Sequence, residues 1–246
     1  MSHLEKLVAQ AVEDARERQR SPLPPSGLAP RPFPRTGLIA EVKRASPSRG
    51  AINQSGLDPA ALAAAYERGG AGAISVLTDR THFGGSLADL RAAREAVALP
   101  VLRKDFIVTE FQVREARAHG ADAILLIAAA APLATLRPLR HLARELGMAV
   151  LFEVHEESEL EAARACEPDL LGVNARNLKT LEVYPEAFGR IAPLARGIAP
   201  LVAESGVRTA EDVRRYRALG ASMLLVGEAL SSAADPESAT RALVRA

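Results

Sequence analysis

The sequence predicts an α/β protein of the (β/α)8, or TIM-barrel, class with an N-terminal helical extension. Eight short apolar runs recur along the chain, and segments rich in Ala, Leu, Glu and Arg with helical spacing lie between them. Strands that are apolar on both sides indicate a parallel sheet buried on both faces, and eight of them favour closure into a barrel. A doubly wound open sheet is the competing fold, but its GxGxxG fingerprint does not follow the first strand.

The chain opens with an amphipathic helix, because apolar residues recur at helical spacing between Leu4 and Ala15. Six prolines follow in the segment 21–34, which cannot hold a regular helix and is therefore expected to be an extended connector. We expect one domain over residues 1–246, in which 1–34 form the helix and the connector and 35–246 form the barrel.

The strands of the barrel are expected at the apolar runs. These are Leu38–Val42, Ala73–Leu77, Pro100–Leu102, Ala123–Ile127, Ala149–Phe152, Leu170–Val173, Leu201–Ala203 and Met223–Val226. Helices are expected between them, for example at Pro59–Arg68, Leu87–Val97 and Ala210–Leu219. Three helical segments end in a Gly-Ala step, where glycine supplies the left-handed residue that often terminates a helix.

Composition argues against several classes of partner. Lys and Arg number 31 against 30 Asp and Glu, and a net charge of +1 gives no field that would recruit nucleic acid or an anionic membrane. The single Cys166, expected in a helix-to-strand connector, cannot form an intramolecular disulfide or a cysteine-cluster metal site. With no apolar stretch long enough to span a bilayer and no apolar leader, a cytoplasmic enzyme is expected, as a monomer or a weak homo-oligomer.

Polar residues cluster at the carboxyl ends of the apolar runs. They are Glu41 and Lys43, Lys104, Glu153, Asn174 and Arg176, Glu204 and Ser205, and Glu228. In a (β/α)8 barrel these ends converge on one rim, where active sites are built. Any one of them could simply mark where a strand leaves the core, but their recurrence on six strands favours a shared pocket.

The residue types suit acid–base chemistry on a phosphorylated small molecule. Lysines near carboxylates can donate protons, and Glu153 could act as a general base if its surroundings raise its pKa. Ser205-Gly206 and Gly227, after the last two strands, match the usual phosphate site of such barrels, where small residues expose backbone N–H groups. The segment 46–50 has the composition of a substrate-covering loop, although an ordinary surface turn fits it equally well.

The chain resembles the indole-3-glycerol phosphate synthases in five segments that occur in order. The segments are Ile39–Ser48, Ala73–Leu87, Leu102–Ile107, Gly172–Leu178 and Val202–Val207. The resemblance spans about Leu38 to Leu230. It implies closure of an indole ring on 1-(2-carboxyphenylamino)-1-deoxyribulose 5-phosphate in tryptophan synthesis, with loss of CO2 and then of water, and without a cofactor or a metal.

The resemblance also implies a role for each matching residue. Lys104 would be the general acid that protonates the ketone oxygen, and Glu153 the acid/base group of the later proton transfers. Lys43 would contact the substrate and could act as an acid in dehydration, with Glu41 orienting it. The order in which the two lysines act stays open.

The remaining roles concern binding. Asn174 and Arg176 would hold the ring side of the substrate, and Glu204 would support the network. The phosphate would be bound by Ser205, Gly206, Gly227 and the Glu228 amide, and the pocket would also be lined by Ser46 and Phe106.

Three departures from the family pattern concern loops. Residues 53–59 replace an Asp-Phe-Asp-Pro-like run that follows the first signature in the family. Residues 182–184 read Glu-Val-Tyr where Glu-Val-Asp is expected after the sixth strand. Glu228 occupies the position after the last glycine, where the family often has a serine. If Glu228 serves phosphate only through its backbone N–H, the last change is tolerable, whereas a carboxylate turned inward would repel the anion.

Two other functions remain open from the sequence. A phosphoribosylanthranilate isomerase would share the fold and the anion site but would typically use a Cys/Asp pair, where this chain has Glu and Lys. A non-catalytic barrel scaffold would be expected to lose Lys104 or Glu153, and both are present.

Overall fold

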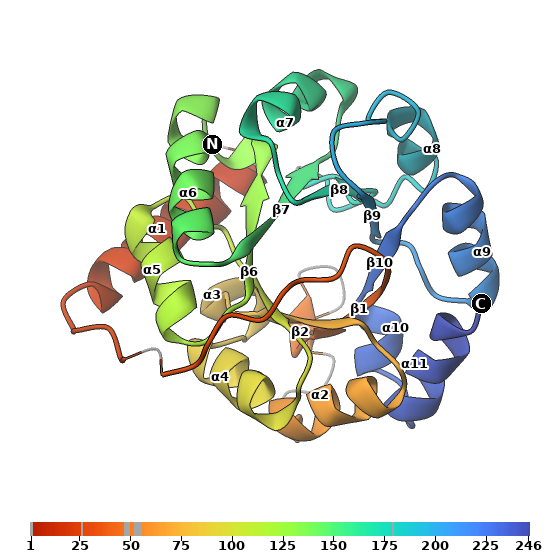
Figure 1. The fold of residues 1–246 in the computed structure, drawn as a ribbon, viewed down its shortest axis with the longest axis horizontal. Helices are drawn as coiled ribbons and strands as arrows, with labels where there is room; N and C mark the ends of the chain where they lie inside the picture. The colour runs from red at the N-terminus through yellow and green to blue at the C-terminus, as the bar shows by residue number, and fades with distance from the viewer. Residues whose placement is uncertain (1, 26, 47–49, 52–55, 179) are drawn as a thin grey trace.

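Eight parallel strands close into a barrel in the computed structural model, which describes residues 2–25, 27–46, 50–51, 56–178 and 180–246. The strands are hydrogen-bonded in the order β1-β10-β9-β8-β7-β6-β5-β4, with β1 also paired to β4 (Figure 1). Their bounds are β1 Gly37–Val42, β4 Ala73–Leu77, β5 Val101–Lys104, β6 Ala123–Ile127, β7 Ala149–Val154, β8 Leu170–Asn174, β9 Leu201–Glu204 and β10 Met223–Val226. The predicted (β/α)8 fold is confirmed.

The helices surround the barrel. They are α2 Pro59–Arg68, α3 Arg80–Phe83, α4 Leu87–Ala96, α5 Glu110–Ala118, α6 Leu133–Glu145, α7 Leu160–Cys166, α8 Ala187–Ile191, α9 Ala210–Ala218, α10 Glu228–Ser231 and α11 Pro236–Val244, with 3-10 turns η1 Ala128–Ala130 and η2 Glu157–Glu159. Local sequence sets their ends: Asp58 accepts backbone hydrogen bonds at the start of α2, and Thr109 forms a capping box at the start of α5. The glycines of the Gly-Ala steps have φ between 92° and 100°, as their position after a helix requires.

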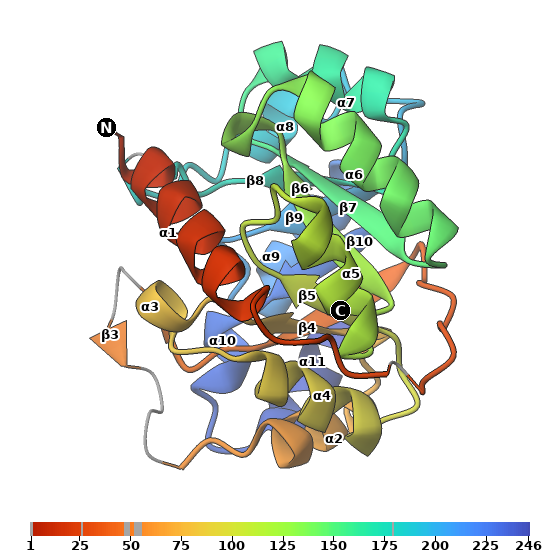
Figure 2. The same cartoon turned by 90° about the vertical axis from the view of Figure 1, so that its left-hand side faces the viewer.

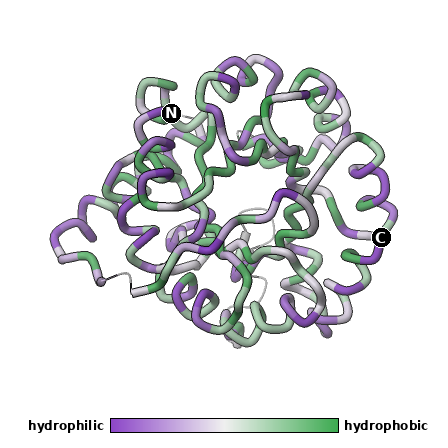
Figure 3. The backbone as a smooth tube through the Cα atoms, in the orientation of Figure 1, coloured by the Kyte–Doolittle hydropathy of each residue, from purple (hydrophilic) through white to green (hydrophobic). Residues whose placement is uncertain are grey.

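Apolar side chains form two cores. One lies between the strands and the outer helices, and the other fills the barrel itself. Residues of the inner core alternate along each strand, for example Ile39 of β1, Leu102 of β5, Leu151 of β7 and Val202 of β9. Figure 3 shows hydrophilic residues mainly on the outer sides of the helices. Strand positions that continue this alternation toward the carboxyl end therefore face the barrel mouth.

Helix α1, His3–Arg18, covers that mouth. Its Leu4, Leu7 and Ala11 pack against the inner core, and a capping box between Ser2 and Glu5 begins the helix. In Figure 2 α1 lies diagonally across one end of the barrel, next to α3. The predicted N-terminal helix is thus present, and it closes one side of the opening where the strands end.

The connector after α1 crosses the opposite end of the barrel, the face nearest the viewer in Figure 1. The backbone N–H of Arg31 donates to buried Asp122 at 2.8 Å, and its guanidinium donates to the carbonyl of Val97 at 2.7 Å. Extended backbone suits this role because the hydrogen-bonding groups of the connector bind to the barrel rather than to one another.

Several boundaries differ from expectation. Strands β5, β7, β8 and β9 continue through Lys104, Glu153, Asn174 and Glu204, because these polar side chains find partners inside the barrel instead of ending the strand. The segment after β1 forms a two-stranded antiparallel pair, β2 Ala45–Ser46 and β3 Gly50–Ala51, and residues 47–49 between them lie outside the described part of the chain.

The expected position of Cys166 was wrong. It is the last residue of α7, Leu160–Cys166, and is buried rather than part of the connector. Across the described ranges, no helix combines the length and apolar character needed to cross a membrane.

Candidate active site

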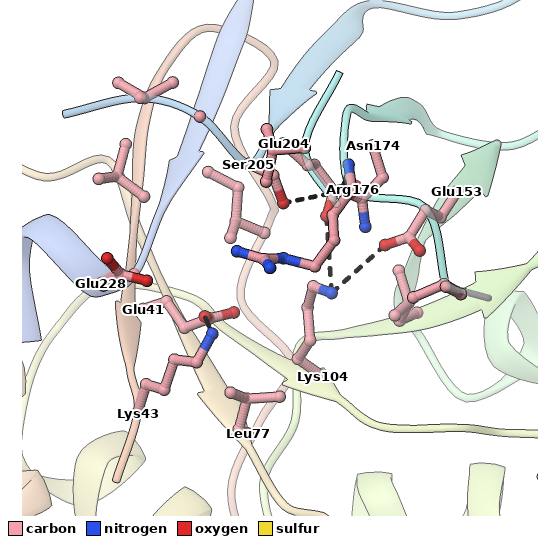
Figure 4. A pocket seen from close by; sticks show the side chains of 18 of the residues that line it. Glu41, Lys43, Leu77, Lys104, Glu153, Asn174, Arg176, Glu204, Ser205 and Glu228 are labelled. Carbon is pink, nitrogen blue, oxygen red and sulfur yellow. Dashed lines mark hydrogen bonds and ion pairs between the residues drawn. The ribbon is translucent and has the colours of Figure 1, made fainter. Parts of the chain in front are cut away.

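A pocket of about 440 Å³ opens at the carboxyl ends of the strands, under α1. Of the residues singled out from the sequence, those that line it are Glu41, Lys43, Lys104, Phe106, Glu153, Asn174, Arg176, Glu204, Ser205, Gly206, Gly227 and Glu228 (Figure 4). The backbone of Ser46 belongs to β2, but its side chain lies outside what the structure describes. A cavity of this size accommodates a small organic ligand.

Strand alternation explains why these residues meet. Glu153 follows Leu151 by two positions, and Glu204 follows Val202 by two, so each carboxylate continues the inward-facing row of its strand. Gly172 in β8 makes room for the Glu204 carboxylate, because a Cβ at that position would collide with Oε1. The barrel interior is therefore apolar below and ionic at the rim.

Lys104 lies between two buried carboxylates. Its Nζ is 3.3 Å from Glu153 Oε2 and 3.6 Å from Glu204 Oε2, and both glutamates are almost fully buried (Figure 4). Three ionisable groups in one low-dielectric volume cannot all take their solution charges without cost. Their protonation is therefore coupled.

The pKa values of this cluster move in opposite directions. Burial by itself would lower the pKa of Lys104, but the carboxylates of Glu153 and Glu204 outweigh it and raise that pKa. Burial opposes ionisation of Glu153, yet Lys104 and then His155 hold its pKa below the ordinary value, so the raised pKa expected of a general base at this position is not found. Burial and the nearby Glu153 charge raise the pKa of Glu204 well above its ordinary value. These shifts favour a cationic Lys104 beside an ionised Glu153 and oppose a charge on Glu204.

A second lysine faces the same pocket from β1. Lys43 Nζ lies 3.8 Å from Glu41 Oε1 and 5.7 Å from the centre of the Phe83 ring. Burial lowers the pKa of Lys43, and Glu41 partly opposes that shift. The Ser75 hydroxyl donates to Glu41 Oε2 at 3.3 Å, and Gly227 leaves the space that the Glu41 carboxylate occupies. Lys43 can consequently release a proton more readily than Lys104.

Asn174, at the end of β8, connects Arg176 to the start of the segment after β9. Asn174 Oδ1 accepts hydrogen bonds from the Ser205 hydroxyl at 2.8 Å and from the Arg176 backbone N–H at 3.0 Å. The Arg176 guanidinium donates to the Leu181 carbonyl at 2.8 Å and lies in the pocket beside Lys104 in Figure 4. Arg176 thus adds a fixed positive charge to the two lysines.

The expected phosphate site combines unusual backbone with further charge. Ser205 and Gly206 have φ of 67° and 80°, and a left-handed serine is a strained conformation of the kind found at functional sites. Arg208 and Arg215 also line this end of the pocket. The Glu228 carboxylate lies 4.0 Å from the Arg208 guanidinium, so its negative charge is partly balanced.

Pocket residues that were not anticipated come from α1, from the loop after β4 and from the segment after β9. They include His3, Leu7, Asp79, Arg208 and Arg215. His155, which contacts Glu153, was also missed, although it lies two residues after Glu153 just as Lys43 lies two after Glu41. The same spacing would have identified it. No pattern in the sequence places His3 or Leu7, because their position depends on how α1 docks.

Within the ranges that the structure describes, no three His, Cys, Asp or Glu side chains are grouped as a metal site would require. Glu41, Glu153 and Glu204 lie instead within ion-pair distance of Lys43 or Lys104.

The fold and the pocket define a class: a (β/α)8-barrel protein with an ionic acid–base site at the carboxyl ends of its strands. A family model described as indole-3-glycerol phosphate synthase matches residues 8–243. The chain belongs to this family.

Individual relatives agree with that assignment. Proteins named indole-3-glycerol phosphate synthase from Mycolicibacterium gilvum and from a Nocardioides species are 52% identical over 242 residues and 56% identical over 206 residues. The first alignment covers 98% of this chain and 88% of the relative, and the second covers 84% and 79%.

Solved structures share the fold at much lower identity. A 3-hexulose-6-phosphate synthase from Salmonella typhimurium superposes with a TM-score of 0.67 at 15% identity, covering 85% of this chain and 97% of that one. A thiamine phosphate pyrophosphorylase from Pyrococcus furiosus gives 0.64 at 18% identity, covering 86% and 95%. These likenesses concern the barrel alone.

Proposed function

We propose that this chain is a carboxy-lyase that converts 1-(2-carboxyphenylamino)-1-deoxyribulose 5-phosphate into indole-3-glycerol phosphate, CO2 and water. The observation that carries the proposal is the placement of Lys104 between Glu153 and Glu204, with Lys43 and the Ser205-Gly206 turn in the same pocket. The family membership supports the same reaction.

Charge complementarity supports this substrate. The substrate carries a phosphate at one end and a carboxylate on its ring at the other. Ser205, Gly206, Gly227 and the Glu228 N–H are assigned to the phosphate, with Arg208 and Arg215 adding positive charge nearby. Asn174 and Arg176 are assigned to the ring side. Phe106 supplies apolar surface to the pocket.

The ring-closing step is assigned to Lys104. As the ring carbon attacks the ketone carbon, Lys104 donates a proton to the ketone oxygen, and loss of CO2 then returns the ring electrons. The ionised Glu153 keeps Lys104 a cation, and the Glu204 carboxyl supports the network without reacting.

Dehydration follows with the loss of the hydroxyl formed in the first step. Glu153 is assigned the removal of the ring proton that the substrate loses in this step. A lysine ammonium protonates the leaving hydroxyl, which departs as water. Lys43 is suited to that donation because burial lowers its pKa, and Glu41 orients it at 3.8 Å. Lys104 remains the competing donor for this step.

The competing functions have less support. A phosphoribosylanthranilate isomerase would require a Cys/Asp pair, but the described strand ends carry Lys and Glu, and Cys166 is buried in α7 away from the pocket lining. A binding scaffold has no need for a coupled cluster whose burial opposes the charge of each member.

The experiment is an assay on the purified chain with two substrates. Incubation with 1-(2-carboxyphenylamino)-1-deoxyribulose 5-phosphate should produce indole fluorescence and one CO2 per indole, while phosphoribosylanthranilate should be left unchanged. Indole formation that requires no added metal and is inhibited by excess inorganic phosphate would fit the assigned site. Isomerisation of phosphoribosylanthranilate without indole formation would refute the proposal.

We further propose a cytoplasmic enzyme that acts as a monomer or a weak homo-oligomer and binds no nucleic acid. A single cysteine and a net charge of +1 support this assignment. Sedimentation of the purified chain at several concentrations would test the oligomeric state.

A further inference from the structure

Glu153 has a second partner on the side away from Lys104. Its Oε1 lies 3.2 Å from Nε2 of His155, while its Oε2 faces Lys104 at 3.3 Å. The approach of the imidazole is that of an ion pair rather than of a well-aligned hydrogen bond. The two oxygens of the carboxylate are therefore held by different groups.

The imidazole is largely buried between two carboxylates, although neither ring nitrogen makes a hydrogen bond. Its side chain is only 11% exposed, and its Nδ1 lies 3.9 Å from Glu159 Oε2. The same carboxylate oxygen accepts a hydrogen bond from the His155 backbone N–H at 2.6 Å and from the Glu156 N–H at 3.2 Å. Lys104, Glu153, His155 and Glu159 thus form a row in which basic and acidic groups alternate.

His155 does not share the wall on which the substrate is placed. It lines a neighbouring cavity of about 610 Å³, whereas Glu153 lines the substrate pocket. Among the charged groups around this second cavity are Glu156 and Glu159 on the near side and Glu186 and Arg190 on the side of α8. An imidazole in this place can act on substrate only through Glu153.

We infer that His155 is a positioning residue for the reaction assigned to this pocket: it holds Oε1 of Glu153 so that Oε2 is presented to Lys104 and to the substrate. The inference rests on the proposed role of Glu153. Free rotation of a carboxylate, or its collapse onto Lys104 with both oxygens, would misplace the proton acceptor, and small misplacements of reacting groups are costly.

Electrostatics act in the same direction. Burial opposes a charge on His155, but Glu153 and then Glu159 raise its pKa, and Lys104 opposes them. A protonated imidazole beside Glu153 in turn helps to keep the pKa of Glu153 low. Loss of the imidazole should therefore raise the pKa of Glu153. The acid limb of the pH–rate profile would then lie at a higher pH than in the wild-type enzyme.

The test compares single-turnover rates of full-length variants between about pH 3 and 9, a range that extends below the ordinary pKa of a glutamate. His155→Phe keeps a ring but removes both nitrogens, and His155→Leu is a second removal variant in case the first misfolds. The rate should fall about 10- to 100-fold, the cost of a misplaced reacting group. KM should stay within about threefold of wild type, because His155 touches no substrate.

Two further variants separate positioning from packing. His155→Asn retains an N–H donor near Glu153 and should recover most of the rate, but its acid limb should still lie above that of wild type. His141→Leu, at an exposed position of α6, should match wild type throughout. Circular dichroism and thermal unfolding establish that each variant is folded.

The outcomes distinguish the inference from the function on which it rests. Turnover by Glu153→Gln at the wild-type rate would overturn the role of Glu153 and the inference with it. If Glu153→Gln is inactive while folded His155→Phe or His155→Leu keeps the wild-type rate and acid limb, the inference alone is wrong. Equal loss in His155→Asn and His155→Phe, with an unshifted acid limb, would indicate packing and would also overturn it.

Discussion

The carboxylate of Glu228 stands at the end of the pocket assigned to phosphate. It lies 4.0 Å from the Arg208 guanidinium and acts on Lys43 by raising its pKa. A negative charge at an anion site opposes binding, and the Arg208 contact offsets part of that opposition. Glu228 can therefore set how tightly the phosphate end is held without taking part in the chemistry.

Replacing Glu228 with Gln should lower KM about two- to fivefold, since a partly exposed charge contributes about 0.5–1 kcal/mol. The difference should shrink at high salt because exposed charges are screened. Steady-state kinetics at two ionic strengths measure both effects, with Glu161→Gln on the exposed face of α7 as the control. An unchanged or increased KM would show that the carboxylate does not oppose the phosphate.

Individual site residues could be predicted from the sequence where they continue a strand. Glu41, Glu153 and Glu204 each follow an inward-facing apolar residue by two positions, so the two-residue alternation of the strand locates them. The alternation gives no information on protonation. The opposite pKa shifts of Glu153 and Glu204 depend on burial and on the distances to Lys104 and His155, which only the folded arrangement defines.

At the scale of secondary structure, α1 is attached to the strand that carries Lys104. Arg18, at the end of α1, forms two hydrogen bonds with buried Glu115 at 2.7 Å and 3.1 Å. Glu115 also pairs with buried Arg103 at 3.0 Å, and Arg103 pairs with Asp105 at 2.8 Å. Lys104 lies between these last two residues in the sequence, so the ionic network attaches the helix over the mouth to the strand that carries Lys104.

Arg18→Met should loosen α1 and weaken substrate binding, because Leu7 and His3 would no longer complete the pocket wall. KM should rise about three- to tenfold, as expected for loss of a charged hydrogen bond that contributes about 1 kcal/mol or slightly more. Arg16→Met is a matched control, since Arg16 is 71% exposed and pairs only with exposed Glu13 among the ion pairs described. Equal KM values for the two variants would contradict the coupling.

The sequence predicts that the connector is extended, but it does not predict that the connector covers the end of the barrel opposite the pocket. Its prolines exclude a helix, whereas the contact of Arg31 with Asp122 joins residues 91 positions apart and leaves no local trace in the sequence. Deleting residues 1–34 would therefore remove both the cover of the mouth and the seal of the opposite end. Point changes in α1 test the cover alone.

For the molecule as a whole, stability and chemistry lie at opposite ends of the barrel. Asp122 is fully buried at the end away from the pocket, where it pairs with buried Arg94 at 2.8 Å and accepts from the backbone N–H groups of Arg31 and Val101. Removing one partner of a buried ion pair leaves an uncompensated charge. The chemistry assigned to the rim does not depend on this pair directly.

Asp122→Ala should accordingly lower the free energy of unfolding by about 3–5 kcal/mol. Folded enzyme below its unfolding transition should keep kcat close to wild type, since the pocket is at the other end. Urea unfolding and kinetics at low temperature measure the two quantities, and exposed Glu161→Ala should change neither. A stability loss under about 1 kcal/mol, typical of surface sites, would contradict this division of roles.

The most direct measurement of the whole account is the single-turnover formation of indole by Lys104→Met and Glu153→Gln beside the wild-type chain. Both side chains are assigned proton transfers, and such groups commonly contribute about 10²- to 10⁴-fold. We predict losses in that range for both variants, with thermal unfolding still cooperative and phosphate still bound. Near-normal indole formation by both folded variants would contradict the placement of the chemistry at this cluster.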